Sequence, residues 1–152
     1  MFMIVVMRIF AENRKATFNY EILEKFEAGL VLLGLEVKSI KSGGVSLAGS
    51  YVVPRNNELW LVGCHIHPYQ PKNTPQGYLP ERERKLLLTK KELSYLTGRI
   101  SQKGLTFVPL KIYTKNGKIK LEFALAKPIK KIDKRQVIKK REINREIKEY
   151  LG

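Results

Sequence analysis

The sequence contains one cysteine and two histidines among 152 residues, and its acidic side chains are only about half as numerous as its basic ones. A single cysteine excludes an internal disulfide framework and is typical of a reducing compartment, so we expect a cytoplasmic protein. Residues 1 to 10 are apolar, but they are too short to span a bilayer and lack the basic start and the cleavage site of a signal peptide. We therefore expect no membrane partner, and a first strand over residues 4 to 10.

The charge balance is the strongest compositional signal. Twenty-nine Lys and Arg against fourteen Asp and Glu give a formal net charge of +15 and a pI near 10.0. Such an excess is typical of proteins that bind polyanions, with RNA or DNA first. A lysine-rich solvated surface, as in some thermophile proteins, is the alternative, but those proteins usually gain Glu together with Lys. A chain of this length fits one domain with a substantial core.

Residues 13 to 47 combine a basic cluster, a short helix and an apolar strand with no linker between them. Asn at a helix start can accept a backbone N–H, which predicts a helix over residues 19 to 26. The apolar run at residues 30 to 33 predicts a strand covered on both sides. A second short helix is predicted over residues 36 to 41. We interpret this stretch as one structural unit.

Two strands are predicted over residues 50 to 53 and 58 to 67, joined by a turn at residues 54 to 57. Strand alternation places Trp60 and Cys64 on one face. Both residues are therefore more typical of a core than of a functional site.

His65 and His67 share the other face of this predicted strand. A metal site needs three or four converging ligands, and Cys64 projects away from the two histidines. An RNA-cleaving acid and base pair would use the same histidines, but the sequence places no third group to support it. We therefore expect no metal, no cofactor and no catalytic residue.

A long loop is predicted over residues 68 to 80, because four of the seven prolines lie there. Arg82, Arg84 and Lys85 follow this loop. Their charges are explained equally well by phosphate contact and by ordinary solvent exposure. The residues alone do not distinguish these two interpretations, and the family resemblance given below favours phosphate contact.

A hairpin over residues 105 to 126 is the clearest structural prediction, because Asn116-Gly117 is the preferred pair for a two-residue type I′ turn. If Lys115 pairs with Lys118, one outer face carries Lys111, Tyr113, Lys115, Lys118 and Lys120. The opposite face would fill the core with Leu110, Ile112, Ile119, Leu121, Phe123 and Leu125. An aromatic ring among lysines suits base stacking with phosphate neutralisation, although a solvated charged edge has the same composition.

The pattern of elements predicts a mainly β fold. Thr89 and Glu92 form a capping box for a helix that Gly104 ends, and this helix would plug or flank the strands. Many short strands joined by hairpin turns indicate a small antiparallel barrel of the oligonucleotide-binding type, with flanking helices and a basic C-terminal tail.

The C-terminal tail, residues 127 to 152, holds ten Lys and Arg and four Asp and Glu. Its apolar stripe of Ile143, Ile147, Tyr150 and Leu151 is interrupted by polar residues one and two turns earlier. We infer a tail that is disordered alone and becomes helical against RNA, attached to an RNA-binding barrel of residues 1 to 126. A helix packed on the barrel is the alternative.

Several groups of residues occur in a fixed order along nearly the whole chain. They are Asn13-Arg14-Lys15-Ala16, Phe26-Glu27-Ala28-Gly29, Gly34, Glu36-Val37-Lys38-Ser39, Pro80 with Arg82, Arg84-Lys85-Leu86-Leu87-Leu88, Gly104 through Tyr113, and Asp133-Lys134-Arg135. This series resembles the signature of the small protein B family, the SsrA-binding proteins of bacteria. Several separate motifs in one order make the resemblance more specific than a single short pattern.

The resemblance implies a non-enzymatic RNA-binding adaptor. Such a protein would bind the tRNA-like domain of transfer-messenger RNA and bring it to ribosomes stalled on broken messages, in the process called trans-translation. Its tail would enter the messenger channel and reach the decoding centre of the small subunit. Elongation factor Tu on the same RNA is compatible with this interpretation. A ribosomal structural protein or a general RNA-binding protein is the alternative.

The resemblance also assigns RNA-binding roles to Asn13, Glu27, Leu87 and Lys120. With the side chains identified above, the predicted RNA-binding set is Asn13, Arg14, Lys15, Phe18, Glu27, Lys38, Arg82, Arg84, Lys85, Leu87, Lys111, Tyr113, Lys118 and Lys120. The predicted ribosome-binding set is Lys130, Lys131, Ile132, Asp133, Lys134, Arg135, Lys139, Lys140 and Arg141.

The chain departs from the family pattern at three places. Phe18 stands where relatives often have His, so it can stack on a base but cannot hydrogen-bond one. Pro128-Ile129 replaces a more basic, glycine-containing hinge, which predicts a stiffer entry into the tail. Ile132 replaces a ring before Asp133, which leaves only an apolar contact there.

Overall fold

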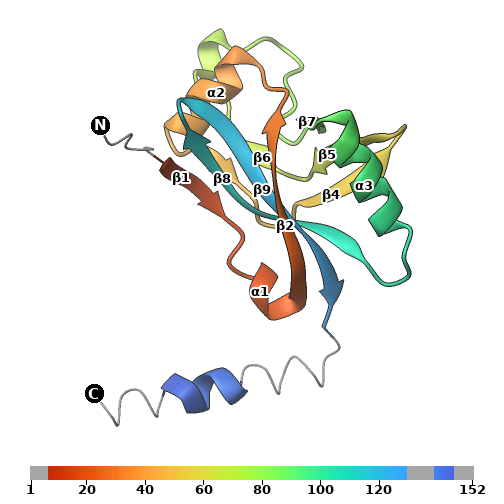
Figure 1. Cartoon of the computed structure of the whole chain (residues 1–152). Helices are drawn as coiled ribbons and strands as arrows, with labels where there is room; N and C mark the ends of the chain where they lie inside the picture. Colours follow the sequence, from red (N-terminus) through yellow and green to blue (C-terminus); the bar gives the residue numbers. More distant parts are fainter. Residues whose placement is uncertain (1–6, 130–138, 146–152) are drawn as a thin grey trace, which may run out of the picture.

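Six antiparallel strands close into a barrel in the computed structural model, which describes residues 7–129 and 139–145 (Figure 1). In order around the barrel they are β4 (Tyr51–Arg55), β5 (Glu58–Val62), β7 (Arg84–Leu87), β2 (Tyr20–Leu30), β9 (Lys118–Pro128) and β8 (Thr106–Lys115). The ring closes where Phe107 of β8 pairs with Val52 of β4. The predicted antiparallel barrel of the oligonucleotide-binding type is confirmed.

The remaining strands and helices lie around this barrel. They are β1 (Met7–Glu12), which pairs with β8, the short ladder of β3 (Val45–Ser46) and β6 (His65–Ile66), and the helices α1 (Ala16–Asn19), α2 (Gly34–Lys41), η1 (Pro71–Asn73) and α3 (Lys90–Ile100). In the described part of the chain, no helix is long and apolar enough to cross a membrane.

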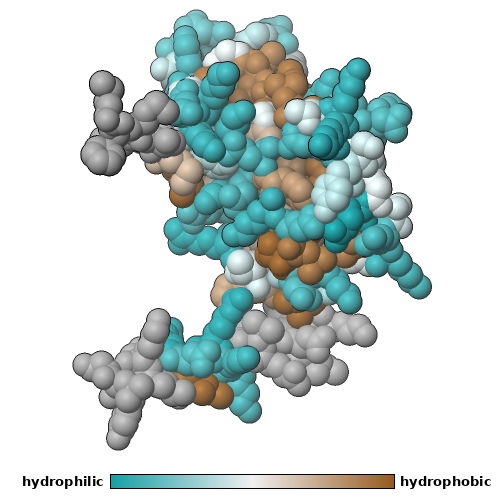
Figure 2. All heavy atoms as spheres, viewed as in Figure 1, coloured by the Kyte–Doolittle hydropathy of each residue, from teal (hydrophilic) through white to brown (hydrophobic). Residues whose placement is uncertain are grey.

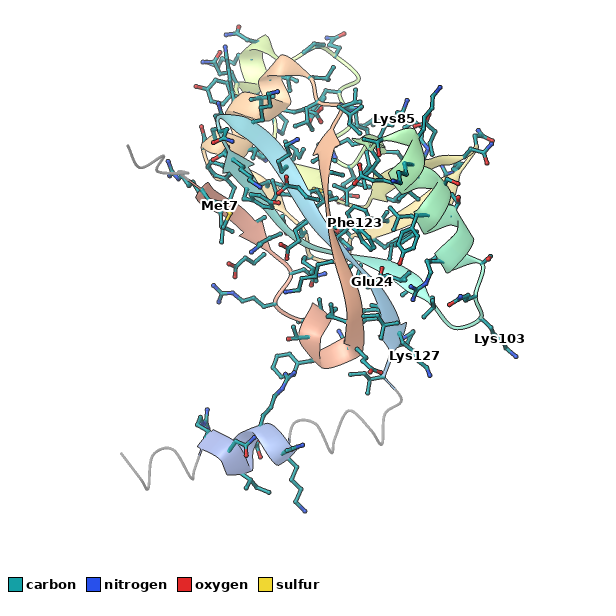
Figure 3. The ribbon with its side chains drawn as sticks, viewed as in Figure 1. Met7, Glu24, Lys85, Lys103, Phe123 and Lys127 are labelled. Atoms are coloured by element: carbon teal, nitrogen blue, oxygen red, sulfur yellow. The ribbon has the colours of Figure 1, made fainter. Side chains whose placement is uncertain are left out.

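The barrel interior is filled by apolar side chains from every strand of the ring. Phe123 lies near its centre, with its ring centroid 5.6 Å from that of Phe26 and 5.8 Å from that of Phe107 (Figure 3). α3 packs against this core through the fully buried Leu96. The helix predicted to begin after Thr89 is confirmed, and both hydrogen bonds of its capping box are present.

The β8–β9 hairpin has the predicted register. Lys115 pairs with Lys118, and the two turn residues, Asn116 and Gly117, have the positive φ angles that a type I′ turn requires. The prediction for Leu110 is wrong, because the ladder is irregular between Pro109 and Lys111. A bulge adds one residue to a strand and so reverses the faces beyond it. Leu110 therefore packs with a second apolar cluster outside the main core.

The helix predicted over residues 19 to 26 is wrong, because α1 ends at Asn19 and residues 20–26 belong to β2. β2 pairs with β9 over most of its length and with β7 at its end. Its ladder is irregular between Ile22 and Glu24, so the adjacent apolar residues Ile22 and Leu23 mimic helical spacing in the sequence. Beyond this point Ala28 and Leu30 alternate into the core, as strand periodicity requires. The strand predicted over residues 30 to 33 is also wrong, because β2 ends at Leu30 and residues 31–33 form a short connection to α2.

The strand predicted over residues 58 to 67 is interrupted at Gly63, which has a φ of +78°. A Cβ at this position would lie 3.1 Å from the carbonyl oxygen of Gly49, so the backbone passes too closely for a side chain. The interruption changes which residues face inward. Leu61 and Cys64 are both fully buried, whereas Trp60, which was predicted to be core, is only half-buried.

The barrel extends slightly beyond its predicted end at residue 126. Pro128 of β9 pairs with Tyr20, and the Ile129 N–H donates to the Asn19 carbonyl oxygen at 3.0 Å. The entry into the tail is therefore fixed to the barrel. Residues 139–145 are helical and exposed, and residues 130–138 and 146–152 of the tail lie outside the described part of the chain.

One charged network lies inside the protein. Glu36 of α2 and Arg84 of β7 are both fully buried and form an ion pair, and Arg82 donates to the same carboxylate. Glu36 also accepts the backbone N–H of Leu33 at 2.9 Å, which satisfies a donor at the start of α2. Burial opposes ionisation of Glu36, but the hydrogen bonds from Arg82, Leu33 and Arg84 outweigh it and lower its pKa.

The guanidinium of Arg84 is also held by backbone carbonyls. Its Nη1 donates to the Cys64 carbonyl at 2.8 Å, and its Nη2 donates to the Pro80 carbonyl at 2.9 Å. The Tyr78 hydroxyl lies 3.1 Å from Glu36 Oε2. The network therefore joins α2, β7 and the loop of residues 68 to 80.

We expect Glu36→Gln to destabilise the fold by about 3 to 5 kcal/mol, because it leaves the Arg84 charge buried without its counterion. The measurement is the urea midpoint of unfolding. The matched control is Glu83→Gln, which removes an exposed ion pair with Arg55 and should shift the midpoint far less. Equal shifts for the two variants would contradict this account.

The same network makes stability sensitive to acid. The pKa of Glu36 is lower in the folded chain than the value of about 4.3 expected in the unfolded chain. Its contribution to stability is therefore complete above about pH 4.3 and is lost as the pH falls through the folded pKa. We expect the urea midpoint to fall more steeply below about pH 4.3 in the natural protein than in Glu36→Gln. If the urea midpoints of the two proteins fall in parallel with pH, Glu36 is not the source of the acid sensitivity.

Candidate nucleic-acid interface

A groove crosses the outer surface where β7, β2 and β9 lie side by side. Gly29 of β2 pairs with Leu87 on one side and with Lys120 on the other, so the three residues form one row across the sheet. The groove has a volume of about 450 Å³ and is lined by Gly29, Leu30, Leu32, Val37, Leu87 and residues 117–120. We call it the Gly29 groove. The structure thus brings together two residues, Leu87 and Lys120, that were predicted to bind RNA.

Gly29 gives this groove its depth. A Cβ there would lie 3.3 Å from Leu87 Cβ, so any side chain would crowd the floor. Leu87 itself is 52% exposed, and Val31 and Leu33 are similarly exposed nearby. Figure 2 shows apolar surface over the end of β2 and the start of α2, surrounded by hydrophilic side chains. The groove therefore offers an apolar contact without a bulky side chain in the way.

Two lysines on one wall of the groove carry its positive charge. Lys118 and Lys120 form no ion pair with any described residue, whereas Lys111 lies 3.8 Å from Glu122 and Lys115 lies 3.7 Å from Glu27. The outer face of the hairpin therefore holds fewer available cations than its composition predicts. Phosphate contacts are best supported at Lys118 and Lys120.

Tyr113 was predicted to stack on a base, and the structure contradicts this prediction. Only 3% of Tyr113 is exposed, and its hydroxyl donates to Glu27 Oε2. Burial and the neighbouring Glu27 raise the pKa of the tyrosine, so it stays a neutral donor. Glu27 is thereby positioned at the surface, and its Oε1 has no hydrogen-bond partner among the described residues.

A second predicted site lies at the start of α1, beside a larger cleft of about 850 Å³ that residues of β1, α1, β3 and β4 line. The Asn13 side-chain amide donates to the Pro109 carbonyl at 3.0 Å, which fixes the side chain and leaves its oxygen as an acceptor. The Arg14 side chain is 89% exposed, although its Nε lies 3.8 Å from Glu12 Oε2, and Lys15 is exposed beside it. Lys15, which forms no ion pair with any described residue, is therefore the better supported of the two cations for a ligand contact, and Arg14 is accessible beside it.

Phe18 of α1 is 41% exposed, and the Arg141 guanidinium lies 5.2 Å from its ring centroid. This distance is within the range of a cation–π contact. The aromatic residue that departs from the family pattern thus faces a tail residue. Lys139 and Lys140 are exposed on the same helical segment, and the predicted tail residues from Lys130 to Arg135 lie outside the described residues.

Of the three cations after the long loop that were predicted to bind RNA, one is contradicted by the structure. Arg84 is fully buried in the network with Glu36, so the prediction that it contacts RNA is wrong. Arg82 donates to Glu36 and to the Val31 carbonyl. Lys85, labelled in Figure 3, lies 3.0 Å from Glu58. Arg82 and Lys85 each have an intramolecular partner but remain partly exposed, so their contacts with RNA stay a prediction.

The cysteine and the histidines show no metal-binding arrangement. No group of three or more potential ligands converges among the described residues. Cys64 is fully buried, and burial raises the pKa of its thiol to about 11. His65 Nδ1 lies 3.6 Å from Glu81, and His67 is exposed.

Sequence reasoning missed two residues that shape the site. Glu36 was taken only as part of a motif on a helix, yet it anchors α2 beside the groove. The available signal was an acid three residues after Leu33 together with two arginines, Arg82 and Arg84, at alternate positions much later in the chain. These residues could have indicated a buried ion pair. Tyr78 contributes to the same network and had no local signal at all.

Comparison with known proteins adds an independent observation. The family model described as SmpB protein matches residues 10–152. The SsrA-binding protein of Thermosynechococcus vestitus is 50% identical over 141 residues, which cover 93% of each chain. The SsrA-binding protein of a Sulfurihydrogenibium species is 49% identical over 140 residues, which cover 92% of this chain and 91% of the relative.

A solved structure gives the same result at the level of the fold. A chain described as "tmRNA-SmpB: a journey to the center of the bacterial ribosome" has a TM-score of 0.65 and 42% identity to this chain. The match covers 88% of this chain and 94% of that chain.

We expect the double variant Lys118→Ala, Lys120→Ala to weaken binding to RNA and to reduce the salt dependence of the affinity. The logarithmic salt slope should fall by about 0.7 to 0.9 for each phosphate that the variant no longer neutralises. Fluorescence anisotropy across a salt series measures both quantities.

The control for this variant is Lys91→Ala, Lys103→Ala, which removes the same charge from α3 and the turn after it. Both lysines are exposed, and neither lines the Gly29 groove. If both double variants bind RNA equally weakly, binding depends on net charge and not on the groove.

Proposed function

The chain belongs to the SmpB protein family, and we propose that it binds transfer-messenger RNA and delivers it to stalled ribosomes in trans-translation. The observation that carries this proposal is the match of the family model to residues 10–152, joined to close relatives named as SsrA-binding proteins. The basic barrel with its open groove supports it chemically. The protein acts as an adaptor through non-covalent contacts and works where ribosomes do, in the cytoplasm.

The Gly29 groove supports recognition of the tRNA-like domain of this RNA. Lys118 and Lys120 supply the cations that neutralise phosphates, and Leu87 supplies an exposed apolar contact for a ribose or base. Gly29 allows the sugar-phosphate backbone to approach the strand. Glu27 presents an acceptor that suits a ribose 2′-hydroxyl or a base amine, contacts that help to distinguish RNA from DNA.

The start of α1 supports a further contact with the same RNA. Asn13 presents an acceptor at a fixed position, and Arg14 and Lys15 add two exposed charges beside it. This arrangement combines a hydrogen bond that reads a base edge or ribose with charges that neutralise the backbone.

The tail supports the contact with the ribosome. It begins at Ile129, which is fixed to the barrel, and its net charge favours an RNA-lined channel. Lys130, Lys131, Ile132, Asp133, Lys134, Arg135, Lys139, Lys140 and Arg141 are the proposed residues for the messenger channel and the decoding centre. In this arrangement elongation factor Tu can occupy another part of the same RNA.

We expect the protein to bind transfer-messenger RNA more tightly than ordinary tRNA, and to retain this preference at high salt. Affinity for both RNAs is measured across a salt series for the full chain and for a chain truncated after Ile129, where the barrel ends. The preference should survive truncation, while recovery with stalled ribosomes should be lost.

Equal affinities for the two RNAs that vanish together with salt would mean general polyanion binding and overturn the assignment. Stoichiometric recovery with washed ribosomes in the absence of transfer-messenger RNA would indicate a ribosomal structural protein instead.

A further inference from the structure

An exposed patch of aromatic and basic side chains lies on α2 and on the chain after β6. The Lys38 ammonium lies 6.0 Å from the ring centroid of Tyr69, which is 41% exposed. The rings of His65 and His67 lie 6.2 Å apart at an angle of 38°. With the exposed Lys41 of α2, these residues define what we call the α2 platform. Neither the family resemblance nor the Gly29 groove accounts for its rings.

The platform is held in place by backbone contacts to the end of α2. The Ser39 hydroxyl donates to the His67 carbonyl, and the His67 N–H donates to the Gly44 carbonyl at 2.8 Å. Gly44 is required for this contact, because a Cβ there would clash with Ser39 Oγ. The backbone that carries His67 is therefore fixed against α2, which lowers the entropic cost of ordering this part of the platform on binding.

The charge of the platform suits an anion. Lys38 and Lys41 form no ion pair with any described residue, and the acid beside the platform is Glu81, 3.6 Å from His65 Nδ1. Exposed rings next to unpaired cations are the combination that binds unstacked bases together with their phosphates.

The platform and the Gly29 groove both border α2. Val37 lines the groove, and the next residue, Lys38, faces Tyr69. Successive residues of an α-helix project about 100° apart, so α2 has the groove on one flank and the platform on the other. Figure 1 shows α2 at the same end of the barrel as the end of β2.

We propose that the RNA held in the Gly29 groove continues over α2 and places unpaired nucleotides on the α2 platform, with bases against Tyr69 and His67 and phosphates near Lys38 and Lys41. This inference rests on the proposed function, because the occupant is the same transfer-messenger RNA.

The decisive variant is His67→Ala, Tyr69→Ala in the full chain, with affinity for labelled transfer-messenger RNA measured by fluorescence anisotropy. Removal of base stacking should lower the affinity about tenfold. Tyr69→Phe keeps the ring and should bind like the natural protein. Unchanged affinity in the double alanine variant would overturn the proposal, as would an equal decrease in Tyr69→Phe. Thermal melting by circular dichroism establishes that each variant is folded.

Charge is tested separately with a matched pair of variants. Lys38→Ala, Lys41→Ala should lower the salt slope for transfer-messenger RNA by about 0.7 for each phosphate involved, whereas Lys91→Ala, Lys103→Ala should leave it unchanged. Equal effects of the two pairs would contradict a specific role for the platform.

A second probe separates this inference from the proposed function. An unpaired RNA octanucleotide needs no tRNA-like fold, so its affinity should also fall in His67→Ala, Tyr69→Ala. If the natural protein fails to prefer transfer-messenger RNA but the octanucleotide depends on Tyr69, the proposed function fails and the platform stands as a site for unpaired RNA. If the preference is present and neither RNA depends on Tyr69, only the platform is overturned.

Discussion

The buried ion pair of Glu36 and Arg84 is the constraint on which the functional surface depends. The Glu36 carboxylate joins the start of α2 to β7. The Arg84 guanidinium opposite it donates hydrogen bonds to the backbone carbonyls of Cys64 and Pro80. Burying such a pair has a large desolvation cost, so its contribution is to fix the geometry of the two elements as much as to stabilise the fold. α2 is thereby held in one position, and its two flanks carry the Gly29 groove and the α2 platform. The buried ion pair therefore fixes the position of the charged and apolar side chains that α2 presents at the surface.

The parts of the fold that were predicted from the sequence are those specified by local interactions. The capping box at Thr89 and the Asn116-Gly117 turn each act over a few neighbouring residues, and both elements form as expected. β2 could not be predicted in this way, because its conformation is set by pairing with β9, which lies far along the chain. Bulges in β2 and β8 then disturb the alternation from which a face would be inferred.

The candidate site also contains residues that the sequence indicates and residues whose roles depend on distant partners. The residues placed at the site by motif, Leu87 and Lys120, come together because strand register aligns both with Gly29. Residue type alone misassigned Arg84 and Tyr113, since a basic or aromatic side chain serves equally well inside a protein when a carboxylate lies opposite it. Glu36 and Glu27 are those carboxylates. Their partners lie far away in the sequence, so no local pattern indicates them.

The closure of the barrel is uneven, and this has a consequence for its motions. The β4–β5 hairpin is joined to β8 through the pair of Val52 with Phe107 and to β7 through two further pairs, whereas β2 and β9 are paired along most of their length. Local opening in proteins follows such seams of low contact density. Local opening of the barrel should therefore begin at the β4–β8 seam, which a single residue pair closes. β2 and β9, which carry Gly29 and Lys120, would remain paired while the β4–β5 hairpin loosens.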